Sequence, residues 1–121
     1  MGMVRTFRDL VAWQRAMALA EAVYLSTRSM PNEERFGLTM QMRRAAVSVP
    51  SNIAEGHGRQ SRADYLRFLR VARGSLSELS TQIEIATTLQ LLEPPPTMTD
   101  LLAETDRVLQ ALIHSLEKKP N

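Results

Sequence analysis

Arginine is the residue type in this sequence best suited to binding a charged partner. Residues 43–75 contain seven arginines against two acidic residues, a local charge of +5. A guanidinium presents a planar fork of N–H donors that matches the oxygens of a phosphate or a carboxylate. The sequence therefore offers a candidate surface for the phosphate backbone of RNA or DNA. Its members are Arg43, Arg44, Arg59, Arg62, Arg67, Arg70 and Arg73.

A second interpretation follows from the rest of the chain, which carries the opposite charge. Residues 76–121 hold seven acidic residues against one arginine and two lysines, a net charge of −4. Because Arg67, Arg70 and Arg73 recur every third residue, they form a row along a helix that can hold phosphates or pair with carboxylates of a neighbouring helix or subunit. The candidate carboxylates are Glu78, Glu84, Glu104 and Asp106. Both interpretations stay open from the sequence alone.

The remaining polar residues do not form a recognisable catalytic or metal site. The chain has no cysteine, and its two histidines, His57 and His114, have no metal-ligating partner at helical spacing. Glu55 lies close to His57 in sequence, but an ion pair with Arg43 or Arg44 explains it better than catalysis does. We therefore predict a protein that is not an enzyme, has no catalytic residues and needs no cofactor or metal.

Length and composition indicate a single domain over residues 1–121. The chain is 44% hydrophobic and 23% charged, which are ordinary values for a globular domain of this size. Its first ten residues carry Arg5, Arg8 and Asp9 and lack the apolar run of a signal peptide. No segment approaches the roughly eighteen consecutive apolar residues of a membrane span. We predict a cytoplasmic protein without membrane contacts.

Four amphipathic segments must position the arginines. Apolar residues at spacings of three and four predict helices over about 9–28, 38–57, 62–92 and 98–118. The connections are short, and no segment has the alternating pattern of a strand. These features predict an all-α fold, an antiparallel up-down four-helix bundle. The inward stripe predicted for the first helix consists of Leu10, Trp13, Met17, Ala20, Tyr24 and Thr27.

The second predicted helix contains a proline in its middle. Pro50 removes one backbone hydrogen bond and frees the carbonyl of Ala46, at a cost of about 3 kcal/mol unless nearby groups such as Asn52 compensate. We expect a kink at Pro50 and an end to the helix at Gly56 and Gly58. In the third helix, Gly74 predicts the close approach of a neighbouring backbone. The residues that form the structural signature of the fold are Pro50, Asn52, Glu55 and Gly56.

Three separated blocks of the chain resemble the family of 23S rRNA intervening sequence proteins, also called the S23 family. The blocks are FRDLVAWQ at 7–14, GLTMQMRRAAVSVPSNIAEG at 37–56 and ARGSLSEL at 72–79. The resemblance implies a four-helix bundle that assembles into a ring-like homopentamer and has no known enzymatic activity. It also implies kinship with the accessory variability determinant of diversity-generating retroelements, a basic pentameric barrel that binds nucleic acid and a reverse transcriptase.

The sequence thus supports two functions for a bundle that associates with itself. The first is the binding of structured RNA or DNA through the arginine-rich surface. The second is a protein–protein interaction scaffold whose arginines form ion pairs between subunits. Apolar residues beside the inward stripes, such as Val71 and Val108, leave room for a second apolar surface between subunits. The predicted partners are other copies of the chain, RNA or DNA, and another protein.

Overall fold

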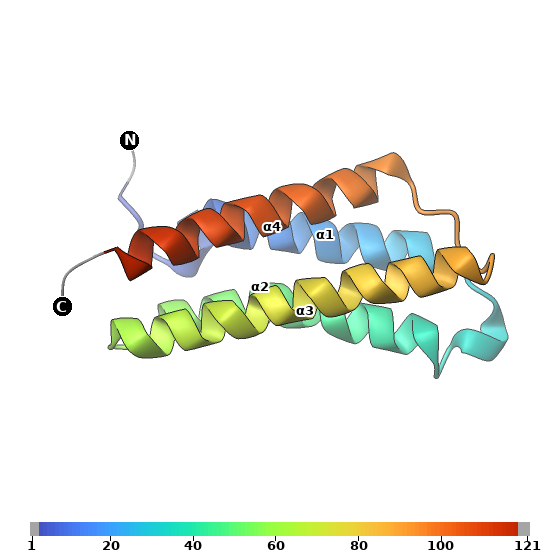
Figure 1. The fold of residues 1–121 in the computed structure, drawn as a ribbon, viewed down its shortest axis with the longest axis horizontal. Helices are drawn as coiled ribbons and strands as arrows, with labels where there is room; N and C mark the ends of the chain where they lie inside the picture. The colour runs from blue at the N-terminus through green and yellow to red at the C-terminus, as the bar shows by residue number, and fades with distance from the viewer. Residues whose placement is uncertain (1–2, 119–121) are drawn as a thin grey trace.

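The protein consists of four long helices. In the computed structural model, which describes residues 3–118, the helices are α1 (Val11–Thr27), α2 (Leu38–His57), α3 (Arg62–Thr88) and α4 (Pro96–Glu117). Single turns of 3-10 helix, η1 (Phe7–Asp9) and η2 (Asn32–Glu34), lie before α1 and before α2. The chain turns back at each connection, so that α1 and α4 lie beside α2 and α3 (Figure 1). The predicted all-α fold with four helices and no strand is confirmed over the described residues.

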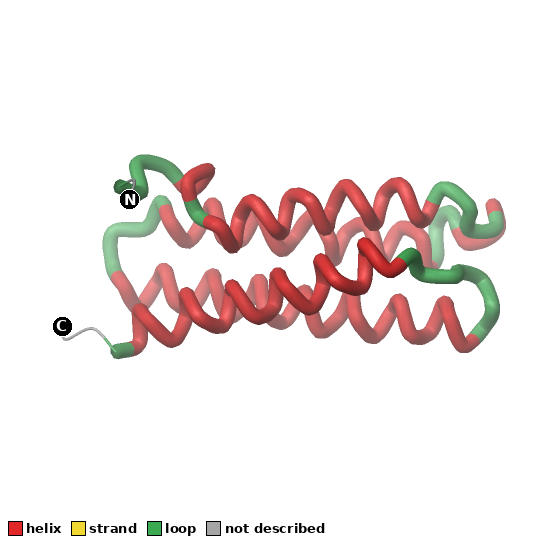
Figure 2. Tube along the Cα trace, turned by 90° about the horizontal axis from the view of Figure 1, so that it is seen from above, coloured by secondary structure: helices red, strands yellow, loops and turns green. Residues whose placement is uncertain are grey.

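All four helices, seen from above in Figure 2, contribute side chains to one hydrophobic core. The most extensive packing joins α2 to α3, and α1 packs against α2 and α4. Burying a leucine or methionine side chain stabilises the fold by about 1.5–3 kcal/mol. The largest fully buried hydrophobic side chains are Leu19, Met42, Ile53, Leu69, Leu79, Met98 and Leu109.

The inward face of α1 was predicted only in part. Of the predicted stripe, Thr27 is buried and Leu10, Trp13 and Ala20 pack against the core, whereas Met17 and Tyr24 are 45% and 42% exposed. The other buried positions of the helix are Ala12, Ala16, Leu19 and Val23. Both stripes have helical spacing, but the alanines let the backbone of α1 come close to its neighbours, and close packing favours that face. The side chain of Tyr24 is consequently available for a contact on the outside of α2.

Helix α2 is continuous across Pro50, whose side chain is buried. Asn52 was expected to bind the Ala46 carbonyl that Pro50 leaves without a backbone partner. Its side chain instead donates from Nδ2 to the Ser48 carbonyl at 2.8 Å and to Ser48 Oγ at 2.9 Å. Ser48 Oγ in turn lies 2.8 Å from Ser75 Oγ on α3. The polar residues around the proline therefore connect α2 to α3, and the kink at Pro50 stays a prediction.

Helix α2 ends at His57 with Gly58 as its C-cap, so the helix end predicted at Gly56 and Gly58 is confirmed. The close contact with a neighbouring helix lies at Gly56, where an added Cβ would come 2.8 Å from Phe68 Cβ and 3.2 Å from the Tyr65 carbonyl oxygen. These contacts leave no space for a side chain, so α2 and α3 approach closely at this point. Around Gly74, by contrast, an added Cβ would meet no heavy atom within 4 Å among the described residues outside the local helix backbone. The predicted close approach at Gly74 is therefore wrong.

Three helix ends differ from the predicted bounds by two residues or more. Helix α1 begins at Val11, two residues late. Helix α3 ends at Thr88, four residues early, and Gln90 just beyond it has a φ of 59°, a left-handed conformation that stops a helix. Helix α4 begins at Pro96, two residues early, because a proline is well tolerated in the first turn. No helix among the described residues is long and apolar enough to cross a membrane.

Candidate nucleic-acid interface

The structure divides the predicted arginines between two helices and the turn that joins them. Arg43 and Arg44 lie on α2, and Arg59 lies in the turn before α3. Arg62 is the first residue of α3 and is half-buried, whereas Arg67, Arg70 and Arg73, here called the α3 row, are exposed. None of the seven predicted arginines is fully buried. All seven therefore have at least part of the side chain at the surface of the chain.

Two members of the α3 row are bound to carboxylates of α4. Arg70 Nη2 donates to Glu117 Oε2 at 2.6 Å, and Arg73 Nε lies 3.5 Å from Asp106 Oδ1. The two arginine side chains remain 54% and 51% exposed. The charge of these arginines is thus compensated, and the carboxylates belong to the same chain.

The acids predicted as partners behave differently from one another. Asp106 binds Arg73, as described, whereas Glu104 binds Arg15 on α1. Glu78 and Glu84 are exposed on α3 and form no ion pair with any residue from 3 to 118. The charge distribution of the sequence therefore indicated that acidic residues after position 75 pair with arginines, but it did not identify which arginine binds which carboxylate.

The turn before α3 contains a second group of paired arginines. Arg59 Nη2 donates to Glu55 Oε1 at 2.6 Å, and its guanidinium lies 4.7 Å from the centre of the Phe68 ring. The guanidinium of Arg67 lies 4.5 Å from the same ring and its Nε is 3.6 Å from Asp64 Oδ1. Phe68 thus has two cation–π contacts, and both arginines also have a carboxylate partner.

The predicted ion pair of Glu55 with Arg43 or Arg44 is wrong, because about three turns of α2 separate them. Arg43 instead contacts the end of α1: its Nε donates to Thr27 Oγ1 at 2.9 Å, and its guanidinium lies 4.6 Å from the centre of the Tyr24 ring. Arg44 is exposed and makes no hydrogen bond or ion pair with any described residue. Neither of these two charges is compensated by a carboxylate.

A groove of about 420 Å³ lies beside these two arginines, between α1 and α2. We call it the arginine groove; its lining includes Tyr24, Arg35, Thr39, Arg43, Arg44 and Val47. Arg35, which lies in the connection after η2, and Thr39 were not predicted from the sequence as part of a site. Tyr24 was not predicted either, because it was placed in the inward stripe of α1 and is 42% exposed. Counting arginines over a window that included residue 35 would have found part of this site.

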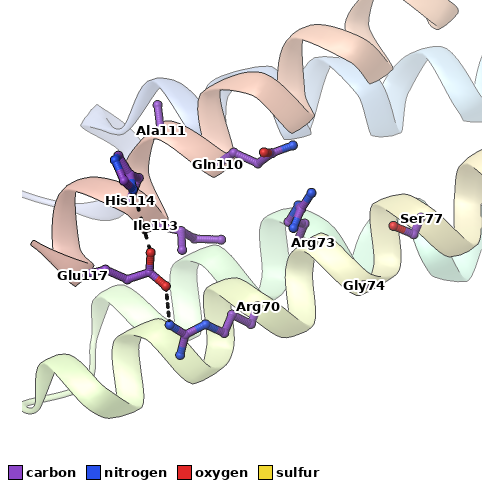
Figure 3. A pocket seen from close by; sticks show the side chains of 9 residues that line it. All are labelled: Arg70, Arg73, Gly74, Ser77, Gln110, Ala111, Ile113, His114 and Glu117. Carbon is purple, nitrogen blue, oxygen red and sulfur yellow. Dashed lines mark hydrogen bonds and ion pairs between the residues drawn. The ribbon is translucent and has the colours of Figure 1, made fainter.

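A larger groove of about 710 Å³ lies between α3 and α4 (Figure 3). Its donors are largely occupied, since Arg70 binds Glu117 and Gln110 Nε2 donates to Asp106 Oδ2 at 2.6 Å. Figure 3 shows Glu117 between Arg70 and His114, whose Nδ1 lies 3.9 Å from Glu117 Oε1. His114 is exposed, as predicted. The polar groups of this groove mostly satisfy one another.

The residues weighed for catalysis have separate partners. Asn52 binds Ser48, Glu55 binds Arg59, and the ring of His57 packs edge-on against Tyr65 with 5.8 Å between the ring centres. Burial raises the pKa of Tyr65, so its hydroxyl stays protonated at neutral pH. Residues 3–118 contain no group of three histidines or acids that could hold a metal ion. The structure does not bring these side chains together around one reacting position.

Comparison with known proteins identifies the family. A model of the 23S rRNA-intervening sequence proteins matches residues 8–114. A solved structure of a protein with unknown function, from the S23 ribosomal protein family of Bacteroides thetaiotaomicron, is 22% identical and has a TM-score of 0.79. The similarity covers 88% of this chain and 98% of that one, and at this identity it shows the shared fold. The curated proteins give no match. Because the family model spans most of its length, the chain belongs to the 23S rRNA-intervening sequence protein family.

Proposed function

We propose that this chain is a non-enzymatic, cytoplasmic protein that binds the backbone of structured RNA or DNA through its exposed arginines. One observation carries the proposal: the side chains of the α3 row are 51–62% exposed although they are paired. Exposed ion pairs contribute only about 0–1 kcal/mol, so a phosphate can replace the carboxylate at little cost. Each phosphate contact also releases counterions from the nucleic acid, which favours binding at low salt.

The same proposal includes self-association of up-down four-helix bundles into a homopentamer. Apolar side chains with 44–60% exposure lie on both α1 and α3, and burial between subunits would remove them from water. They are Val11, Met17, Leu25, Val71, Ile85 and Leu89. The resemblance to the accessory variability determinant of diversity-generating retroelements, a basic pentamer that binds nucleic acid, supports the same assembly.

Binding of labelled structured RNA and duplex DNA across a salt series tests the proposal. We expect binding at low salt whose logarithm falls linearly with the logarithm of salt concentration, by roughly 0.9 per phosphate contact for duplex DNA. The variant Arg67→Ala/Arg70→Ala/Arg73→Ala should bind more weakly and with a shallower slope. Arg107→Ala/Lys118→Ala, which removes exposed charges elsewhere, is the control. Absent binding at low salt, or binding indifferent to salt, contradicts the proposal.

A second candidate function is a protein–protein interaction scaffold without nucleic-acid binding. The compensation of Arg70 and Arg73 by α4 carboxylates favours it, because compensated arginines attract phosphates less strongly. If the arginines hold the assembly together, the triple-alanine variant dissociates into smaller species. Light scattering of that variant, measured beside its nucleic-acid binding, distinguishes the two functions.

A further inference from the structure

We propose that the arginine groove between α1 and α2 is a binding site for a phosphate group, carried by a nucleic-acid backbone or by a small phosphorylated molecule. This inference deepens the proposed function, on which its nucleic-acid arm rests. Arg43 and Arg44 belong to the arginine-rich surface predicted from the sequence, whereas the α3 row does not line the groove. The inference rests on the charges, an unpaired hydroxyl and the shape of the groove.

The first observation is that three guanidinium side chains share one groove without a carboxylate. Of the described residues that line it, three are arginines and none is acidic. Arg43 has only neutral oxygen and aromatic partners, Arg35 lies 4.6 Å from the Phe36 ring centre, and Arg44 has no partner among residues 3–118. A cleft lined by charges of one sign concentrates the opposite charge. An anion would relieve the repulsion between the three arginines.

The position of the nearby carboxylate Glu34 agrees with this assignment. Glu34 Oε1 accepts a hydrogen bond from the Leu38 amide at 3.1 Å, at the start of α2, and it is not part of the groove lining. The charges of the groove arginines are therefore not compensated by a described carboxylate, whereas Arg70 and Arg73 form ion pairs with carboxylates of α4.

The second observation is an unpaired hydroxyl in the groove wall. Thr39 is only 6% exposed, and its Oγ1 is buried without a hydrogen-bond partner among the described residues. Buried polar groups in folded proteins almost always have a partner, so an exception requires an explanation. Thr39 also lies in the first turn of α2, where backbone N–H groups have no partner within the helix and the helix dipole favours an anion. A phosphate oxygen would satisfy this hydroxyl.

The third observation is the size and character of the groove. About 420 Å³ exceeds what a single phosphate needs and falls within the usual range for small-ligand sites. Tyr24 and Val47, which line it, are 42% and 43% exposed. They offer apolar surface to an organic group attached to the phosphate. The groove therefore suits a phosphate ester, such as a nucleotide unit.

A titration with inorganic pyrophosphate, followed by calorimetry on the full chain, tests the site. Arg44→Ala should weaken pyrophosphate binding about tenfold. Since Arg44 has no hydrogen bond or ion pair with any residue from 3 to 118, the bundle should keep its melting temperature. Thr39→Val keeps the side-chain shape and removes the hydroxyl, so it should weaken binding without lowering the melting temperature. Arg107→Ala, an equal change of charge on α4, is the control and should bind as the wild type does.

Competition with labelled structured RNA identifies the source of the phosphate. If pyrophosphate displaces RNA and Arg44→Ala weakens both, the groove holds a backbone phosphate. If pyrophosphate binds in an Arg44-dependent way without displacing RNA, the ligand is a small phosphorylated molecule. The inference is overturned if millimolar pyrophosphate does not bind, or if Arg44→Ala binds it as tightly as Arg107→Ala does. Loss of RNA binding in the α3 triple variant is a separate readout, so the two proposals fail independently.

Discussion

The arginines of the α3 row and those of the arginine groove have the same side chain in different surroundings. Arg70 and Arg73 lie opposite carboxylates of α4, whereas Arg35, Arg43 and Arg44 line a groove that no described acidic residue lines. The net charge of residues 43–75 includes all of these arginines except Arg35 and does not distinguish between paired and unpaired ones. The structure shows that available charge depends on which helix packs alongside, because α4 brings acids to α3.

The largest effect is expected from placing a carboxylate in the groove. Arg44→Glu gives Arg35 and Arg43 an acidic neighbour and makes the groove resemble the α3 row. Losing one charge-assisted contact and adding a repulsive charge should weaken pyrophosphate binding by roughly a hundredfold, given about 1.5–3 kcal/mol for a charged hydrogen bond. Calorimetry measures this, and Arg107→Glu is the matched control. Equal losses in both variants would show that only the net charge matters.

The opposite change should make the α3 row resemble the groove. Asp106→Asn/Glu117→Gln removes the carboxylates from Arg73 and Arg70, so RNA affinity at low salt should rise by roughly tenfold, as expected for two added phosphate contacts. A filter-binding salt series gives the affinity and the slope.

Glu78→Gln/Glu84→Gln is a matched control for that variant, because it removes two exposed α3 acids that have no ion pair with a described residue. We expect a smaller gain in affinity from it. A gain as large as that of Asp106→Asn/Glu117→Gln would mean that the ion pairs with α4 do not weaken RNA binding by Arg70 and Arg73.

A smaller difference should appear in stability. Arg70→Ala removes an exposed ion pair and should lower the free energy of unfolding by about 0.5 kcal/mol. Arg44→Ala removes no hydrogen bond or ion pair with a described residue and relieves repulsion, so it should leave the free energy of unfolding unchanged or slightly higher. Urea denaturation of the two variants side by side measures the difference. Equal destabilisation would show that Arg44 has a structural role.

The smallest effect concerns a carboxylate that is held by backbone amides instead of arginines. The amides of Arg5 and Thr6 donate to Asp9 Oδ2 and hold the pKa of Asp9 below its usual value. This contribution to the stability of η1 is present above the ordinary pKa of an aspartate and is lost as the pH falls through the lowered one. NMR shifts of the two amides should report this acid transition, and Asp9→Asn should abolish it. An unchanged transition in Asp9→Asn would assign it to another group.

Much of the fold followed from apolar spacing, since a buried stripe identifies a helix and its inward side. The bounds of α2 were predicted in this way. The inward face of α1 was predicted only in part, because two overlapping stripes have the same period there. The stripe that contains the alanines becomes the buried one only when the neighbouring helices are in place. The apolar spacing within a helix also does not show whether Gly56 or Gly74 lies against the backbone of a neighbouring helix.

The candidate sites were harder to predict than the fold for a related reason. The Arg70–Glu117 pair joins residues 47 positions apart, and it depends on how far α4 slides along α3. The arginine groove combines Tyr24, Arg35 and Thr39 from a helix, a connection and the next helix. The sequence shows how many arginines the chain contains, but the partners of these arginines are set only when the helices pack.

The close approach of α2 and α3 at Gly56 also bears on the order of folding. These two helices pack most extensively and are joined by a short turn, so their contacts close a small loop, which is the kind of contact that forms fast. We expect the α2–α3 hairpin to form before α4 docks, and pulsed hydrogen exchange should protect its amides first. Until α4 arrives, Arg70 and Arg73 would lack their α4 carboxylates, so the nascent hairpin would present these arginines to any anion in solution before the bundle closes.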